Sequence, residues 1–115
     1  MPPAGGYSRL RLRRGVDFRA VYSSRRAVRG RLFTMHWRPS DLGHPRVGFS
    51  VSTKVGDAVE RNRVKRCLRE AARPLLGGLD RGVDIVVVVR PVAAGLNCAA
   101  LNSEFRSLAS QVLGL

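Results

Sequence analysis

Residues 57–73, DAVERNRVKRCLREAAR, hold the pattern that decides the fold. Asp57 is a typical N-cap residue, and its charge complements the positive end of a helix dipole. Apolar side chains recur behind it at helical spacing and fall on one arc of about 100°: Val64, Cys67, Leu68, Ala71 and Leu75. Pro74 and the glycines at 77 and 78 predict where the helix ends. The stretch therefore predicts an amphipathic helix, and only Val59 does not fit its apolar arc.

The other face of this predicted helix is basic. Arg61, Lys65, Arg69 and Arg73 follow one another at i, i+4, with Asn62 and Arg66 among them. Like charges at this spacing repel by about 0.2–0.5 kcal/mol per pair, and only Glu70 is placed to relieve Arg66. The repulsion disappears against a polyanion, and the planar fork of arginine suits phosphate. The pattern favours a phosphate-binding face, and the alternative is a solvated basic surface.

The composition also indicates an anionic partner. The chain has 115 residues, 44% of them hydrophobic, which is enough for one compact domain with a modest core. Its 21 basic and 8 acidic residues leave a net charge of +13, so nucleic acid and anionic membrane are the candidate partners. The longest aliphatic run, residues 85–89, is far too short to cross a bilayer. Because residues 1–6 lack the apolar core of a signal peptide, we expect a cytoplasmic protein.

The rest of the chain alternates between helical and extended patterns. We expect a flexible arm over residues 1–8 and a single domain over 9–115. The patterns predict helices over 17–23 and from 97 or 98 to 113, and strands over 32–38, 46–53 and 83–90; residues 24–31 are expected to form a basic turn. The last strand is apolar on both faces and should lie centrally in the sheet. The order predicts helices packed on a small sheet, an α/β sandwich.

Two short patterns bear on binding. Phe18 and Tyr22 share one side of the first predicted helix, so their rings are either core residues or partly open platforms for unpaired bases. In the strand over 46–53 one face carries only Gly48, Ser50 and Ser52. That face is either simply exposed or lets RNA or another element approach closely.

We find no catalytic motif in the sequence. The eight acids form no recognisable metal-binding or acid–base pair, and His36 and His44 lie in unrelated contexts. Cys67 and Cys98 lack CxxC spacing, so the sequence predicts neither a disulfide framework nor a zinc site. Cys67 is expected to be a small core residue on the apolar helix face.

Residues 46–73, RVGFSVSTKVGDAVERNRVKRCLREAAR, strongly resemble the protein subunit of bacterial ribonuclease P. The hallmark is the RNR tripeptide, here 61–63, together with the strand and the KVG approach before it; weaker agreement extends over about 9–112. The resemblance implies an α+β fold, a two-layer α/β sandwich. Its small mixed sheet has about four strands, with an N-terminal helix, the RNR helix in a left-handed βαβ crossover, and a C-terminal helix. Many members have a glycine about where this chain has Arg25, which departs from the pattern.

The resemblance also implies a function. In this family an RNA is the catalyst, and Mg²⁺ held mainly by that RNA activates the water that removes the 5′ leader of precursor tRNA. The protein contributes no catalytic residue and no metal ligand, and its partners are the catalytic RNA and precursor tRNA, with no membrane and no protein partner required. The residues that would face the catalytic RNA are Lys54, Arg61, Asn62, Arg63, Lys65, Arg66 and Arg69. Those that would line a cleft for the leader are Phe18, Tyr22 and His36.

Two other functions fit part of the pattern. A small ribosomal-type protein or RNA chaperone would explain the charge and the fold class, but not the run over 46–73. A free-standing nuclease would need metal-binding carboxylates that the sequence does not indicate. Activity tests separate the three, because the first needs the catalytic RNA, the second cleaves nothing and the third cleaves alone.

Overall fold

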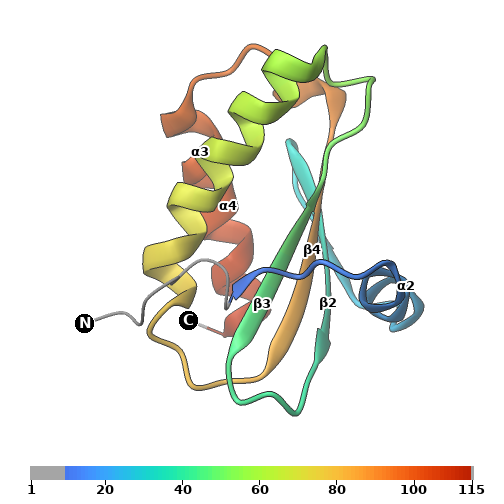
Figure 1. The fold of residues 1–115 in the computed structure, drawn as a ribbon. Helices are drawn as coiled ribbons and strands as arrows, with labels where there is room; N and C mark the ends of the chain where they lie inside the picture. Colours follow the sequence, from blue (N-terminus) through green and yellow to red (C-terminus); the bar gives the residue numbers. More distant parts are fainter. Residues whose placement is uncertain (1–9, 115) are drawn as a thin grey trace.

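Four strands and three α-helices make up residues 10–114, the part of the chain that the computed structural model describes (Figure 1). The α-helices are α2 (Gly15–Ser23), α3 (Ala58–Leu76) and α4 (Cys98–Leu113), with a 3-10 turn η1 (Pro91–Ala93). The strands are β1 (Ala27–Arg29), β2 (Phe33–Pro39), β3 (Pro45–Ser50) and β4 (Val83–Val89), arranged in the order β1-β2-β4-β3. The expected α+β fold with a mixed four-stranded sheet is confirmed. The arm expected over residues 1–8 lies outside the described residues.

The sheet is organised around β4, as the apolar run predicted. β4 pairs with β2 in antiparallel register and with β3 in parallel register. Its side chains are buried on both faces of the sheet except for a half-buried Val88. Since α3 connects the parallel neighbours β3 and β4, this part of the chain is the βαβ crossover that the resemblance implied, in its left-handed form.

The helices are divided between the two faces of the sheet (Figure 1). α3 and α4 cover one face, and the main core lies beneath them, with Phe33, Met35 and Phe105 fully buried. α2 lies on the other face, where Val21 packs with Leu12 and Val86 in a smaller cluster. This second face is therefore covered only in part, which leaves its remaining surface available for binding.

Helix α3 begins, packs and ends as predicted. Asp57 caps it by accepting a hydrogen bond from the backbone N–H of Glu60 at 2.9 Å. Val59, which does not fit the apolar arc, is 78% exposed. The predicted end at Pro74 and the glycines at 77 and 78 is confirmed: the helix runs through Pro74 to the fully buried Leu76, and Gly77 is its C-cap.

Three local predictions need correction. Residues 24–31 are not only a turn, because β1 pairs there with β2 at the edge of the sheet. β3 ends at Ser50 rather than at residue 53. Cys67 is buried as expected, but the two cysteines are bonded to each other, because the fold brings the start of α4 against α3 with a Cα–Cα distance of 5.4 Å.

The backbone of the turn after α2 explains why many members of the family have a glycine about where this chain has Arg25. Its φ is +58°, a left-handed backbone conformation that costs a residue with a side chain about 1–2 kcal/mol. Glycine adopts this conformation without that cost. The position therefore has the backbone that a glycine would favour, although this chain has an arginine.

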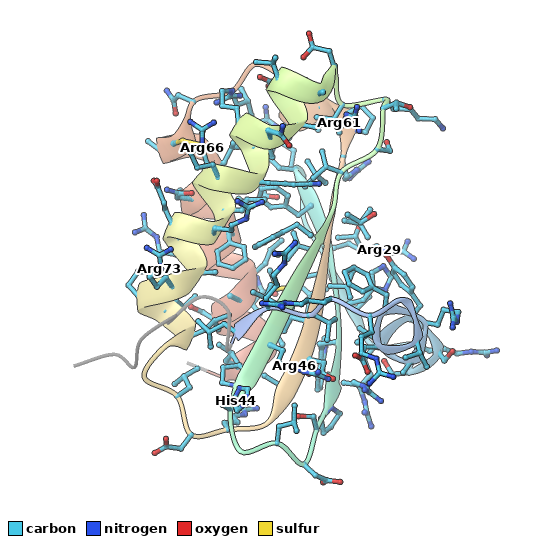
Figure 2. All side chains as sticks on the ribbon, in the orientation of Figure 1. Arg29, His44, Arg46, Arg61, Arg66 and Arg73 are labelled. Carbon is cyan, nitrogen blue, oxygen red and sulfur yellow. A yellow bond between two sulfur atoms is a disulfide. The ribbon has the colours of Figure 1, made fainter. Side chains whose placement is uncertain are left out.

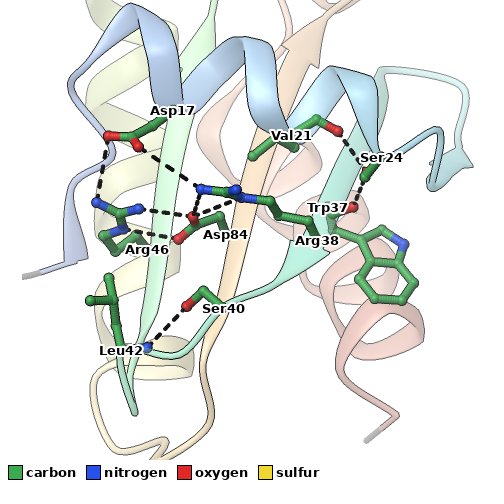
Figure 3. Close-up of polar contacts among 9 residues, drawn as sticks. All are labelled: Asp17, Val21, Ser24, Trp37, Arg38, Ser40, Leu42, Arg46 and Asp84. Atoms are coloured by element: carbon green, nitrogen blue, oxygen red, sulfur yellow. Dashed lines mark hydrogen bonds and ion pairs between the residues drawn. The ribbon is translucent and has the colours of Figure 1, made fainter.

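A buried carboxylate anchors α2 to the sheet (Figure 3). Asp84 of β4 is fully buried and accepts hydrogen bonds from Arg46 at 2.8 and 2.9 Å and from Arg38 at 3.0 and 3.2 Å. The register explains the contact, because Arg38 and Arg46 are the direct neighbours of Asp84 on β2 and β3. Asp17 of α2 lies 3.9 and 3.7 Å from the same two guanidinium groups. This cluster of two acids and two arginines fixes one end of α2 over the strands.

Candidate nucleic-acid interface

A hollow of about 260 Å³ opens beside β3, where three segments of the chain meet. The N-terminal segment runs along β3, with Arg11 bridging to Val47 and the N–H of Leu12 donating to the carbonyl oxygen of Val47 at 2.9 Å. Four cationic side chains line the hollow: Arg11, Arg13, Lys65 and Arg69. The rings of Phe18 and Phe49 line it as well. Cations around aromatic rings suit a strand of nucleic acid, whose phosphates and unpaired bases they contact respectively.

The ring of Phe18 rests directly on Gly48. A Cβ placed on Gly48 would come closest to Cζ of Phe18 and would lie 3.0 and 3.1 Å from Cε1 and Cε2. The small face predicted for this strand thus admits another element of the protein, namely the phenyl ring. Phe18 is only half-buried, so the ring is both packed and partly open to the hollow.

A second aromatic contact lies between α2 and β2. The rings of Tyr22 and His36 meet edge to face with centroids 4.9 Å apart, and Tyr22 is 39% exposed. Burial, with the nearby charge of Arg29 as a second cause, lowers the pKa of His36 below its ordinary value of 6.5. The imidazole is therefore neutral at pH 7 and adds an aromatic surface rather than a cation. Tyr22 and His36 do not line the hollow beside Phe18. The three predicted cleft residues therefore form two separate sites on the α2 side of the sheet, Phe18 at the hollow and Tyr22 with His36 between α2 and β2.

The residues predicted to face the catalytic RNA lie along α3 and just before it. Figure 2 shows Arg61, Arg66 and Arg73 spaced along the helix. Asn62 and Arg66 are exposed, while Arg61, Lys65 and Arg69 are half-buried. Lys54 is exposed in the turn that precedes the helix. Because Lys65 and Arg69 line the hollow together with Phe18, the predicted helix face and one of the three predicted cleft residues meet at the same site.

Arg63 differs from the other predicted residues of α3. Its guanidinium group makes two hydrogen bonds to Glu60, at 2.7 and 2.8 Å, and one to the carbonyl oxygen of Leu96 at 2.8 Å. No ion pair between Arg66 and Glu70 is found within residues 10–114, where Glu60–Arg63 is the one ion pair of the helix. The predicted relief of Arg66 is thus not seen.

Three of the cationic or aromatic residues that line the hollow were not among the predicted site residues. Phe49 belongs to β3, and Arg11 and Arg13 alternate with Leu10 and Leu12, both of which are buried. That alternation of arginine and leucine over residues 10–13 is a strand-like signal, and it could have placed this segment against the sheet. Only the fold brings its arginines to within reach of α3.

Neither a cluster of metal-ligating side chains nor a helix able to span a membrane is found within the described residues. Over residues 10–114, no three side chains of the metal-ligating types His, Cys, Asp and Glu come together. The side chains that line the surface just described include four cations, Arg11, Arg13, Lys65 and Arg69. None of the helices within the same residues is long and apolar enough to cross a membrane.

Comparisons with known proteins show the family of this chain. The family described as Ribonuclease P matches residues 8–113. The ribonuclease P protein component of Dehalococcoides mccartyi strain 195 is 44% identical over 98 residues, which cover 85% of this chain and 80% of that protein. The component from Caldanaerobacter subterraneus is 38% identical over 98 residues, covering 85% and 84%.

The fold agrees as well. The solved structure of the Staphylococcus aureus RNase P protein is similar to this chain with a TM-score of 0.83 and 27% sequence identity, covering 90% of this chain and 94% of that one. The match to the family runs through the whole described domain, from the segment along β3 to the end of α4. This chain therefore belongs to the family of ribonuclease P protein components.

Proposed function

We propose that this chain binds the catalytic RNA of ribonuclease P through the basic face of α3 and holds the 5′ leader of precursor tRNA across the hollow and the aromatic rings of α2. The observation that carries the proposal is the hollow itself, in which Lys65 and Arg69 of the RNR helix meet the ring of Phe18. One helix thus takes part in both contacts, so the protein can hold the leader in a fixed position relative to the catalytic RNA.

The division of labour follows from the chemistry of the side chains. The RNA carries the catalysis in this family, and the Mg²⁺ ions that activate the attacking water are held mainly by that RNA. The protein supplies cations that lower the repulsion between two polyanions, and rings on which unpaired leader bases stack. Attack of that water on the scissile phosphate breaks the bond to the 3′-oxygen of the leader, which leaves as a 3′-hydroxyl, and the phosphate stays on the 5′ end of the mature tRNA. We place this activity in the cytoplasm, where precursor tRNA is processed.

Reconstitution tests the proposal directly. Cleavage of precursor tRNA is measured at near-physiological Mg²⁺ with the protein alone, with the cognate catalytic RNA alone, and with both. We expect efficient cleavage only in the mixture. Cleavage by the protein alone would reveal an active site in the chain, and no gain from adding the protein would favour a ribosomal-type protein or RNA chaperone instead.

Two substitutions test the leader contact. Phe18→Ala and Tyr22→Ala should each weaken binding of leader-bearing precursor tRNA by about 1–3 kcal/mol, the value of one lost base stack. Affinity for the catalytic RNA should stay nearly unchanged, because that contact is assigned to α3. An equal loss of both affinities would mean that the rings serve only the core of the protein.

A further inference from the structure

Arg63 differs from the other cations of α3 because it takes part in a group of hydrogen bonds with Glu60 and residues 95–96, here called the clasp. Glu60 accepts hydrogen bonds from Nε and Nη2 of Arg63 at 2.8 and 2.7 Å, and from the backbone N–H of Gly95 at 2.9 Å. Nη2 of Arg63 also donates to the carbonyl oxygen of Leu96 at 2.8 Å. The clasp thus ties the first turns of α3 to the segment that leads into α4, more than 30 residues later in the chain.

Two glycines lie beside the side chain of Glu60 in the clasp, at positions 56 and 95. A Cβ on Gly56 would lie 3.0 Å from both Cβ and Cγ of Glu60, so a side chain at 56 would press on the carboxylate arm. Gly95 has a φ of +78°, a conformation that favours glycine, and its N–H reaches the carboxylate from there. Gly56 therefore leaves room for the side chain of Glu60, and Gly95 donates a hydrogen bond to its carboxylate.

The clasp also changes the charge that α3 presents. The hydrogen bonds from Arg63, and after them the one from Gly95, lower the pKa of Glu60 to about 2. Glu60 is therefore ionised at neutral pH and neutralises Arg63 at 2.7 Å. Nε and Nη2 of Arg63 are engaged, and a bidentate grip on phosphate requires such a pair of donors. Arg66, in contrast, is exposed and has no acidic partner within residues 10–114.

We propose that Arg63 is a positioning residue of the RNR helix rather than a phosphate contact: through Glu60 it docks residues 94–97 against α3 and holds the first turns of the helix in the orientation that presents Arg61 and Asn62 to RNA. The proposal deepens the proposed function and rests on it. The RNR tripeptide then combines two tasks, in which its first two residues face the partner and its third holds the helix in place.

The salt dependence of binding distinguishes positioning from contact. Each phosphate neutralised adds about 0.7–0.9 to the slope of log K against log[salt]. The dissociation constant for the cognate catalytic RNA is measured over a range of KCl for the wild type and for Arg63→Gln, Glu60→Gln and the matched control Arg66→Gln. If the wild type shows no saturable binding, the proposed function itself fails, and this outcome is separate from the outcomes for the clasp.

We expect Arg66→Gln to reduce the slope by about 0.7–0.9. Arg63→Gln should lower affinity about tenfold, as the loss of a charge-assisted hydrogen bond would, with the slope unchanged. Glu60→Gln should also lower affinity, although it makes the protein more positive, and the double variant should be no weaker than either single one. The proposal is overturned if Arg63→Gln reduces the slope as Arg66→Gln does, or if Glu60→Gln binds RNA more tightly than the wild type.

Amide exchange gives a readout on the protein alone, which matters if Arg63→Gln folds poorly. Glu60→Gln keeps the shape of the side chain, and it should speed the exchange of the Gly95 amide, the donor to this carboxylate. The amide of Leu12, which donates to the carbonyl oxygen of Val47 away from the clasp, is the internal control. Unchanged protection of Gly95 would show that the clasp does not hold this segment, and the positioning role would fail.

Discussion

Gly48→Ala tests whether the close contact between the ring of Phe18 and Gly48 of β3 contributes to stability and to the site. The added Cβ would lie 3.0 Å from Cε1 of the ring and closer still to Cζ, which is inside van der Waals contact. The ring therefore has to move, and overpacking of this kind costs about 1–3 kcal/mol. For 115 residues, with about 2.1 cal/mol/K of unfolding entropy per residue, 1 kcal/mol corresponds to about 4 °C in Tm. We expect a Tm lower by about 4–12 °C.

The sign of the effect should reverse when the ring is removed. In a Phe18→Ala background nothing obstructs the new methyl group, and replacing glycine by alanine at a compatible backbone position stabilises by about 0.4–1 kcal/mol. Urea unfolding of the wild type, both single variants and the double variant gives the coupling energy, which should be about 1.5–4 kcal/mol. Gly78→Ala is the matched control, because a Cβ there meets nothing within 4 Å.

The reasoning fails if Gly48→Ala costs the same with and without the ring. That result would locate the strain in the backbone of β3 rather than in the contact with Phe18. If the coupling is found, the same variant should also weaken binding of leader-bearing precursor tRNA, because the displaced ring no longer lines the hollow beside Lys65. Affinity for the catalytic RNA should change far less.

Three further predictions concern stability. Reducing the Cys67–Cys98 bond, which spans 31 residues, should lower the free energy of unfolding by about 3–4 kcal/mol and Tm by about 12–16 °C. Cys67→Ser should have the same effect, and an unchanged Tm in dithiothreitol would contradict this prediction. Asp84→Asn should cost about 2–3 kcal/mol in urea unfolding, less than for a fully buried pair because its two arginine partners keep part of their hydration. The pKa of Glu60 is lowered from an ordinary 4.5 to about 2, so its contribution to stability is complete above pH 4.5 and is lost as the pH falls toward 2. An NMR titration of the Glu60 carboxylate measures this pKa. A midpoint near 4.5 would mean that the Arg63 clasp is not formed in solution.

The sequence predicts the parts of this fold that depend on periodicity. The apolar arc of α3 and the continuous apolar run of β4 each give a strong local signal, and both elements lie where expected. A three-residue strand such as β1 gives no such signal, because AVR is too short for any period to appear. Its pairing with β2 depends on the turn at Arg25, where an unfavourable backbone conformation is held by the surrounding structure.

The missed contacts share another cause, which is separation along the chain. Cys67 and Cys98 are 31 residues apart, and Glu60 is 35 residues from Gly95. Neither sequence separation corresponds to a known motif. Both contacts form because α4, which follows the central strand β4 in the chain, packs on α3. The hollow has the same origin, since Arg11 and Lys65 meet only when the N-terminal segment runs beside β3.

The placement of the acidic residues explains how a small domain keeps a basic surface. Five of the eight acids have partners inside the protein: Asp17 and Asp84 in the α2 anchor, Asp57 at the helix cap, Glu60 in the clasp, and Glu104, which accepts from the backbone N–H groups of Leu32 and Phe33. Four of these acids join different elements and Asp57 caps its own helix; within residues 10–114 none of the five forms an ion pair with Lys65, Arg66 or Arg69. The repulsion along α3 is therefore left without internal relief, at about 0.2–0.5 kcal/mol per neighbouring pair. The buried face of the helix offsets this cost in the free protein. In the proposed complex a bound polyanion would remove it, so the charges that weaken the isolated helix would strengthen binding of RNA.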